Sequence, residues 1–191
     1  MTRIKHEKAS PNVLCLIEVL ASHQARYIIV GSVAAQLYGA EVQPGDFDIV
    51  PALELDNLTR LAQVLRELEA TLPDTDDIGR WEVQADEEKK WVSRKATPQE
   101  RFQRAGWVPK PEDVSTLDAL FYTRFGNFDV VPELVGDYET LMQRARKMKV
   151  QGQEVWVTHV DELLAALTIP RRQKDVSRVR QLREIQRRLM E

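Results

Sequence analysis

Cysteine and long apolar runs are nearly absent from this chain of 191 residues. Cys15 is its single cysteine, so the sequence excludes a disulfide framework and a metal site built from cysteine alone. No stretch approaches the roughly 18 apolar residues that a membrane-spanning helix requires. The start of the chain leads into a helical pattern that contains Glu18, rather than into the apolar segment of a signal peptide. We therefore expect a cytoplasmic protein with no membrane partner.

Histidine is scarce as well, and the three histidines show no spacing typical of metal ligands. His6, His23 and His159 are therefore interpreted as surface or structural residues. Internal repeats and low-complexity tracts are also missing. With 43% hydrophobic and 30% charged residues, the composition is typical of a soluble globular protein that buries a substantial core.

Positive charge is concentrated near the C-terminus. Residues 141–191 contain 12 Lys or Arg against 6 Asp or Glu, whereas the rest of the chain contains 15 basic and 24 acidic residues. A basic segment on an acidic body favours a local contact with phosphates over a general coating of nucleic acid. A solvated helix face explains the same charges equally well.

The apolar pattern predicts helices and strands in alternation. The expected helices cover residues 12–24, 32–39, 54–72, 137–148, 160–167 and 173–190. The expected strands cover residues 27–30 and 46–50, two strands joined at Gly126-Asn127, and a small hairpin over 150–159. At least one helix or irregular strand is expected within residues 73–115. On the last helix, we expect the packing side to consist of Val176, Val179, Leu182, Ile185 and Leu189.

This order of elements predicts an α/β fold in which helices pack on a small mixed sheet. The length suggests one domain over residues 1–191. We expect its core to lie at about 12–135 and a helical C-terminal segment to follow at about 137–191.

Two acidic residues interrupt the apolar strand GDFDIV. Because strand side chains alternate between faces, Asp46 and Asp48 point one way while Phe47 and Ile49 point into the core. Neighbouring carboxylates repel, and an unpaired buried charge is costly. Either the strand end is solvated, or a hard cation lies between the two groups. Mg²⁺ prefers oxygen ligands and commonly uses one or two carboxylates with substrate phosphates.

Two further features favour the metal. Gly31 and Ser32 follow a strand and open a helix, where backbone N–H groups and the helix dipole suit a phosphate. A third acid, Asp129, stands in NFDVV and repeats the apolar-acid-apolar pattern on another strand. The position two before it is Asn127, so that strand offers a single carboxylate.

The sequence IVGS, a short helix, DFDIV and a later FDVV together resemble the nucleotidyltransferase superfamily that includes DNA polymerase beta. More specifically, the chain resembles the minimal bacterial branch with the AbiEii-type and MenT-type toxins. In that branch the third acid follows a hairpin such as TRFGNFDVV, and a basic Arg-x-Lys-Asp stretch begins the last helix. The resemblance covers roughly residues 12–60 and 117–185.

The resemblance implies a two-metal chemistry for the three acids. Asp46 and Asp48 would bind Mg²⁺, which bridges the triphosphate of an NTP such as ATP. Asp129 would ligate a second metal or deprotonate the attacking hydroxyl. Two metals stabilise the attacking and leaving oxygens of an in-line displacement, and phosphoryl-type transfer depends mostly on positioning and charge neutralisation.

The resemblance also implies residues for the phosphates. Gly31 and Ser32 would hold the β and γ phosphates, and Arg172 and Lys174 would add positive charge. Asp175, the last residue of the basic stretch, would act chemically, pair with Arg172 or cap the last helix.

The chain departs from its relatives at two positions where they often carry basic residues, here Val42 and Leu167. The leading hypothesis is a Mg²⁺-dependent nucleotidyltransferase that acts on a hydroxyl of a tRNA 3′ end, a protein or a small molecule. It would be a toxin with a cognate antitoxin, or an enzyme of the antibiotic-adenylyltransferase kind. The alternative is a degenerate form that serves as a binding scaffold.

Overall fold

A six-stranded sheet forms the centre of the computed structural model, which describes residues 6–73, 77–83, 89–168 and 173–190. Its strands are β1 (Tyr27–Ile29), β2 (Phe47–Pro51), β5 (Ala119–Thr123), β6 (Gly126–Val130), β7 (Arg146–Val150) and β8 (Gln153–Val157). Their order across the sheet is β5-β6-β2-β1-β8-β7. The β2–β6 and β1–β8 pairs are parallel and the other pairs are antiparallel. This mixed sheet confirms the expected α/β class.

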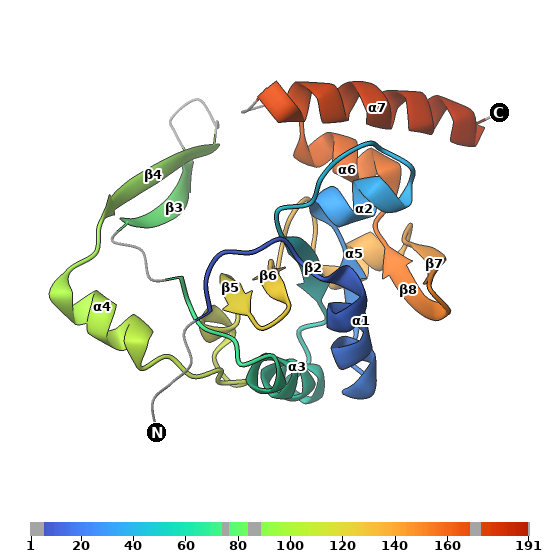
Figure 1. Cartoon of the computed structure of the whole chain (residues 1–191). Helices are drawn as coiled ribbons and strands as arrows, with labels where there is room; N and C mark the ends of the chain where they lie inside the picture. Colours follow the sequence, from blue (N-terminus) through green and yellow to red (C-terminus); the bar gives the residue numbers. More distant parts are fainter. Residues whose placement is uncertain (1–5, 74–76, 84–88, 169–172, 191) are drawn as a thin grey trace.

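Helices surround the sheet (Figure 1). They are α1 (Val13–Ser22), α2 (Gly31–Leu37), α3 (Leu55–Glu67), α4 (Pro98–Ala105), α5 (Tyr138–Met142), α6 (Val160–Ala166) and α7 (Gln173–Met190). Caps explain several helix starts: the Asn12 side chain accepts from the Cys15 amide, and the Asp137 side chain accepts from the Thr140 amide. No described helix has an apolar stretch long enough to cross a bilayer.

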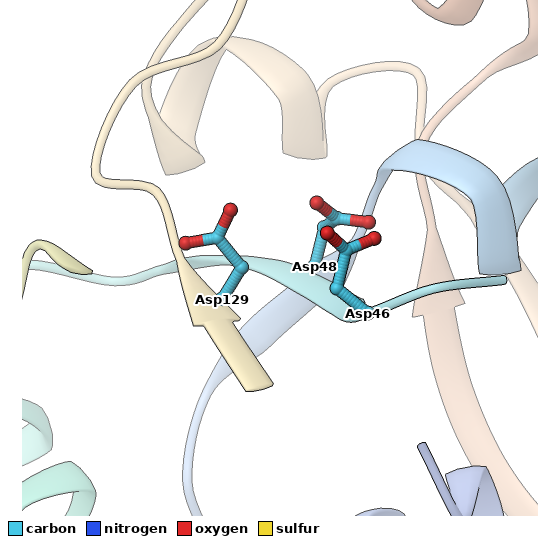
Figure 2. A group of neighbouring side chains, drawn as sticks. All are labelled: Asp46, Asp48 and Asp129. Atoms are coloured by element: carbon cyan, nitrogen blue, oxygen red, sulfur yellow. The ribbon is translucent and has the colours of Figure 1, made fainter. Parts of the chain in front are cut away.

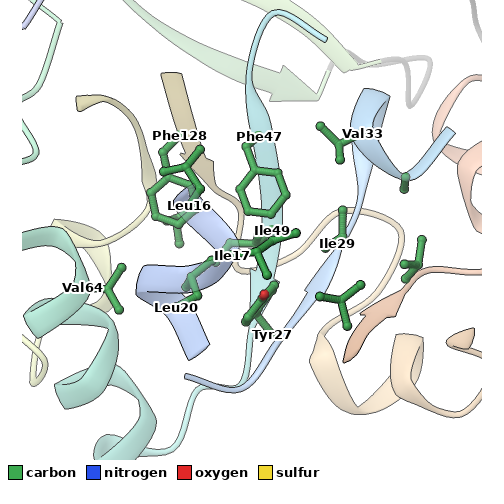
Figure 3. Packing of buried hydrophobic residues seen from close by; sticks show 14 of the residues in the cluster. Leu16, Ile17, Leu20, Tyr27, Ile29, Val33, Phe47, Ile49, Val64 and Phe128 are labelled. Carbon is green, nitrogen blue, oxygen red and sulfur yellow. The ribbon is translucent and has the colours of Figure 1, made fainter. Parts of the chain in front are cut away.

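The main core lies between one face of the sheet and the helices α1 and α3 (Figure 3). Phe47, Ile49 and Phe128 are fully buried there, and the Phe47 and Phe128 rings are stacked with centroids 6.0 Å apart. A second, smaller cluster includes Val50 and Leu141 and joins β1 and β2 to α5. The alternation predicted for GDFDIV is therefore confirmed on its apolar side.

The described residues between 73 and 115 include a separate two-stranded sheet and a helix. Strands β3 (Asp77–Val83) and β4 (Lys89–Lys95) pair only with each other among the described strands, and α4 follows them. Figure 1 shows this arm beside the main sheet. At its end, Trp107 packs on Phe121 with ring centroids 4.9 Å apart and donates to the Thr116 carbonyl 2.8 Å away. The expectation of a helix or strand in this segment is confirmed.

Two sequence predictions need correction. The helix expected over 137–148 ends at Met142, and Arg146 begins the edge strand β7, because pairing with β8 overrides local helix propensity. The junction of β5 and β6 lies before Gly126-Asn127, since Thr123 pairs with Gly126 across the turn. Gly126 has φ +95, and a Cβ there would lie 2.3 Å from the Ser10 carbonyl oxygen, so this position requires glycine.

The long helix α7 buries only part of the apolar stripe that the sequence predicts. Leu182 and Ile185 are buried as expected. Val176 and Leu189, predicted on the same stripe, are 45% and 40% exposed. The prediction is therefore wrong for Val176 and Leu189, and Asp175 rather than Val176 is the buried residue of the first turn.

Candidate functional site

Three acidic side chains converge on one face of the sheet. One carboxylate oxygen from each of Asp46, Asp48 and Asp129 lies within 4.8 Å of the others. Figure 2 shows the three carboxyl groups pointing to the same side of the sheet. All three residues are partly buried. The prediction that these acids, distant along the chain, meet at one place is confirmed.

Strand register explains the convergence. Asp48 on β2 is the direct register partner of Asp129 on β6 in a parallel pair, and Asp46 immediately precedes β2. Side chains at paired positions project from the same face, about 5 Å apart between neighbouring strands. Phe47 and Phe128 project from the opposite face into the core. The same two strands therefore present aromatic rings on one side and carboxylates on the other.

The turn from β1 into α2 closes tightly around Asp48. The Ser32 amide donates a hydrogen bond to the Asp48 carboxylate, and the Val30 amide donates to the Asp48 carbonyl 3.1 Å away. Gly31 has φ +64, and a Cβ on it would lie 2.2 Å from Asp48 Oδ2. Glycine is therefore required here both by conformation and by close approach. The structure places Gly31 and Ser32 in direct contact with the metal-ligand candidate Asp48.

Ser32 is also notable for its side chain. The residue is only 4% exposed, and its Oγ is buried without a hydrogen-bond partner. Buried hydroxyl groups usually find a partner, because desolvation of an unpaired polar group is costly. An unpaired buried hydroxyl beside the acids is expected at a site where a polar ligand would accept its hydrogen bond.

Asn127 holds the segment that leads to Asp46. Its side-chain nitrogen donates to the Gly45 carbonyl at 2.8 Å, and its side-chain oxygen accepts from the Ala9 amide at 3.0 Å. Asn127 is 2% exposed and lies on β6, two residues before Asp129. It therefore connects the backbone beside Asp46 to the strand that carries the third acid.

The electrostatics of the cluster are unfavourable without a cation. Burial, together with the charges of Asp46 and Asp129, raises the pKa of Asp48 well above its ordinary value. Burial and the charges of Asp46 and Asp118 raise the pKa of Asp129 from 3.8 to about 7. Among the described residues, no ion pair to a Lys, Arg or His joins any of the three acids.

This arrangement fits a hard divalent cation. All the converging donors are carboxylate oxygens, which Mg²⁺ and Mn²⁺ prefer over softer ligands. A cation between the acids would remove the repulsion that raises their pKa values. Asp46, Asp48 and Asp129 are the residues that would hold it.

The remaining predicted site residues are placed less closely. Arg172 lies outside the described residues, and only the backbone of Lys174, in the first turn of α7, is described. Asp175 is 2% exposed in the same turn. Val42 and Leu167 both pack against the main core cluster.

Sequence reasoning missed two charged residues near the acids. Asp118, one residue before β5, contributes to the raised pKa of Asp129. Arg178 on α7 acts in the opposite direction and lowers the pKa of Asp48. Asp118 immediately precedes β5, and the antiparallel pairing of Ala119 with Val130 places it beside the segment after Asp129. The register of the predicted hairpin could have indicated this proximity. No local pattern connects Arg178 to a strand 130 residues earlier.

Comparisons with known proteins find similarity to solved structures. No protein-family model and no curated protein matches the chain. Among solved structures, it is similar to an antigenic nucleotidyltransferase-like protein from Paracoccidioides brasiliensis. That match has 16% sequence identity and a TM-score of 0.44, and covers 90% of this chain and 72% of that one. The function proposed below rests on the side chains of the site.

Proposed function

We propose that this protein is a Mg²⁺-dependent nucleotidyltransferase that moves a nucleoside monophosphate from an NTP to a hydroxyl group and releases pyrophosphate. The observation that carries the proposal is the meeting of Asp46, Asp48 and Asp129 within 4.8 Å. Such a cluster has no packing purpose, since each added carboxylate raises the electrostatic cost. A metal-bound triphosphate is the substrate class that this donor set serves best.

The three acids have different roles in the proposed reaction. Asp46 and Asp48 hold Mg²⁺, while Asp129 ligates a second ion or takes the proton of the attacking hydroxyl. When bound, the metal neutralises the charge that develops on the phosphate oxygens. Asn127 keeps Asp46 in place through Gly45, and Gly31 lets the backbone approach Asp48 closely.

We assign phosphate binding to residues at the start of α2 and in the basic Arg-x-Lys-Asp stretch. The unpartnered Ser32 Oγ donates to a phosphate oxygen, which satisfies the buried hydroxyl. Gly31 forms part of the same turn, and the proximity of Gly31 and Ser32 to Asp48 supports the assignment of these two residues. Arg172 and Lys174 would add positive charge, an assignment that follows the resemblance in sequence alone.

For the acceptor we favour an RNA hydroxyl, such as a tRNA 3′ end, over a protein or small molecule. The outer side of α7 carries exposed Arg183 and Arg188, and surface arginines suit a phosphate backbone. Modification of an RNA end would suit a toxin that a cognate antitoxin restrains.

Transfer assays test the proposal directly. The purified protein is incubated with each labelled NTP, Mg²⁺ and total RNA, with cell lysate and small-molecule acceptors in parallel. We expect a labelled product that requires Mg²⁺ and is lost in Asp46→Asn. The matched control is Asp137→Asn, which changes a helix-capping acid away from the cluster and should retain transfer. Label that persists in Asp46→Asn, or no label with any acceptor, contradicts the proposal.

A non-catalytic scaffold is the second candidate, favoured by Val42 and Leu167. Both apolar side chains pack on the core at positions where the resemblance expects basic residues. Calorimetry separates the candidates, because an enzyme binds an NTP in a Mg²⁺-dependent manner and a scaffold that has lost the site does not. Absence of Mg²⁺-dependent NTP binding by the folded protein would favour the scaffold.

A further inference from the structure

One basic residue of α7 faces inward rather than toward solvent. Buried residues recur along this helix at Asp175, Leu182 and Ile185, which are 2%, 0% and 4% exposed. Arg178 lies one turn after Asp175 and one turn before Leu182, on the same side of the helix. It is partly buried, whereas Arg180 is exposed.

Contacts of α7 place this turn beside the acidic site. Gln181 Oε1 accepts a hydrogen bond of 2.6 Å from the Glu41 amide, in the loop that leads from α2 to Asp46. The helix also packs on α6, which in turn packs on α2. Figure 1 shows α7 lying across α6 and α2. Arg178 therefore belongs to the wall of the site that Gly31 and Ser32 form.

The Arg178 guanidinium has no partner within the described residues. Its Nε is buried without a hydrogen bond, and no ion pair to it lies within the 4.0 Å limit. Its charge nevertheless acts on Asp48, whose pKa it lowers. No hydrogen bond or ion pair joins Arg178 to Asp48 among the described residues.

A guanidinium whose Nε is buried without an acceptor is a candidate for binding an anionic ligand. Burial of a donor costs free energy, because its hydrogen bond to water is lost and no hydrogen bond within the protein replaces it. The planar guanidinium carries five donors in a fork that matches two phosphate oxygens at once, which a lysine cannot reproduce. An anion bound between Arg178 and a cation at the three acids would accept hydrogen bonds from the guanidinium and would also coordinate the cation.

We propose that Arg178 binds the triphosphate of the NTP and provides, from α7, the cationic wall opposite Asp48. This inference rests on the proposed function and adds a binding residue to it. The triphosphate is favoured over the phosphodiester of an RNA acceptor because the turn of α7 after Arg178 contacts, through Gln181, the loop that leads to Asp46, a candidate ligand of the cation that the triphosphate would bind.

Isothermal titration calorimetry with inorganic triphosphate and Mg²⁺ tests the inference without knowledge of the base. Loss of a bidentate charged contact is expected to weaken binding by Arg178→Gln about tenfold or more. The matched control Arg180→Gln removes an exposed charge from the same helix and should stay within about twofold of the unaltered protein. Arg178→Lys keeps the charge without the fork and should fall between them.

A metal titration without triphosphate separates this inference from the proposed function. If Arg178 is only a counter-ion of the acids, Arg178→Gln tightens Mn²⁺ binding and leaves triphosphate affinity at saturating metal unchanged, which overturns the inference. Equal triphosphate affinity in Arg178→Gln and Arg180→Gln overturns it as well. Failure of the unaltered protein to bind Mn²⁺ and triphosphate overturns the proposed function together with the inference. Equal denaturation midpoints of the two variants confirm that folding is preserved.

Discussion

The two faces of strands β2 and β6 carry opposite kinds of side chain. On one face, Phe47 and Phe128 are fully buried and stacked. On the other, Asp48 and Asp129 stand side by side in register. The apolar face lowers the free energy of the folded state, whereas the acidic face raises it. The proposed function accounts for this division, because metal ligands would have to stand together on one face even where their repulsion lowers stability.

A second pair of carboxylates shows how acids that serve structure differ. Asp161 and Glu162, at the start of α6, both accept hydrogen bonds from the Arg144 guanidinium. Hydrogen bonds from Gln186 and Arg144 leave the pKa of Asp161 below its ordinary value although burial opposes them. No ion pair joins Asp46, Asp48 or Asp129 to a basic residue in the described part of the chain, and the pKa values of Asp48 and Asp129 are raised. Under the proposed function, a cation would provide the partner that these acids need.

The largest expected effect comes from the apolar face. Phe128→Ala removes a fully buried ring from the core, and we expect the free energy of unfolding to fall by about 3–5 kcal/mol. Urea denaturation monitored by circular dichroism measures the change. A loss below about 1 kcal/mol would contradict the assignment of this face as the main source of stability.

Gly31→Ala should disturb the acidic face next most strongly. The new Cβ would stand 2.2 Å from Asp48 Oδ2 in a backbone conformation with φ +64. We expect the free energy of unfolding to fall by about 2 kcal/mol and transfer activity to fall at least about 100-fold, because Asp48 must move. Gly39→Ala, with φ +96 and open space around its Cβ, controls for the backbone effect. It should lose stability but keep activity.

Asp129→Asn should have the opposite sign on stability. At pH 8 the substitution removes a repelled carboxylate, and we expect the metal-free protein to gain about 2 kcal/mol while transfer is abolished. Asn keeps the shape of the side chain, so packing is unchanged. Paired urea denaturation at pH 8 with and without Mg²⁺ measures the gain. A destabilised variant in metal-free buffer would refute the repulsion described for this face.

The pH dependence of stability sharpens the same contrast. The pKa of Asp129 is raised from 3.8 to about 7 in the folded protein, so the folded state binds more protons than the unfolded state between these values. The contribution of Asp129 to stability is therefore present below about pH 4 and is lost as the pH rises through 7. In metal-free buffer, we expect Asp129→Asn to gain most over the unaltered protein at pH 8 and little at pH 4. A gain that does not depend on pH would contradict this linkage.

The smallest effect is expected at the partnered acids. Arg144→Gln breaks an exposed ion pair on the surface, and we expect thermal denaturation to shift little, with less shift at high salt. Transfer activity should be unchanged, since Arg144 lies outside the acidic cluster. A change in activity comparable with that of Gly31→Ala would show that the two regions are coupled.

Local patterns in the sequence, together with the family resemblance, predicted the acidic cluster. The alternation in FDIV and FDVV determines which face each acid occupies, and parallel pairing of β2 with β6 brings Asp48 beside Asp129. The glycine requirement at Gly31 also follows from a strand-to-helix turn.

Long-range contacts account for most of what the sequence did not predict. The hydrogen bond from Asn127 to Gly45 spans 82 residues, and Arg178 approaches Asp48 from the opposite end of the chain. Strand β7 was predicted as helix because pairing with β8, rather than its own residues, determines its conformation. Val42 and Leu167 are uncharged at positions where the resemblance expects basic residues. Arg178 provides a positive charge from another position, and no sequence motif indicated it.

A crystal structure with Mn²⁺ and a non-hydrolysable NTP, grown above pH 7.5, tests the central claim most directly. Anomalous scattering locates the metal independently of the protein coordinates. We predict a peak bound by oxygens of Asp46, Asp48 and Asp129, with the triphosphate between it and α7. An ordered nucleotide with no metal at these three carboxylates, or a metal bound elsewhere, would contradict the account.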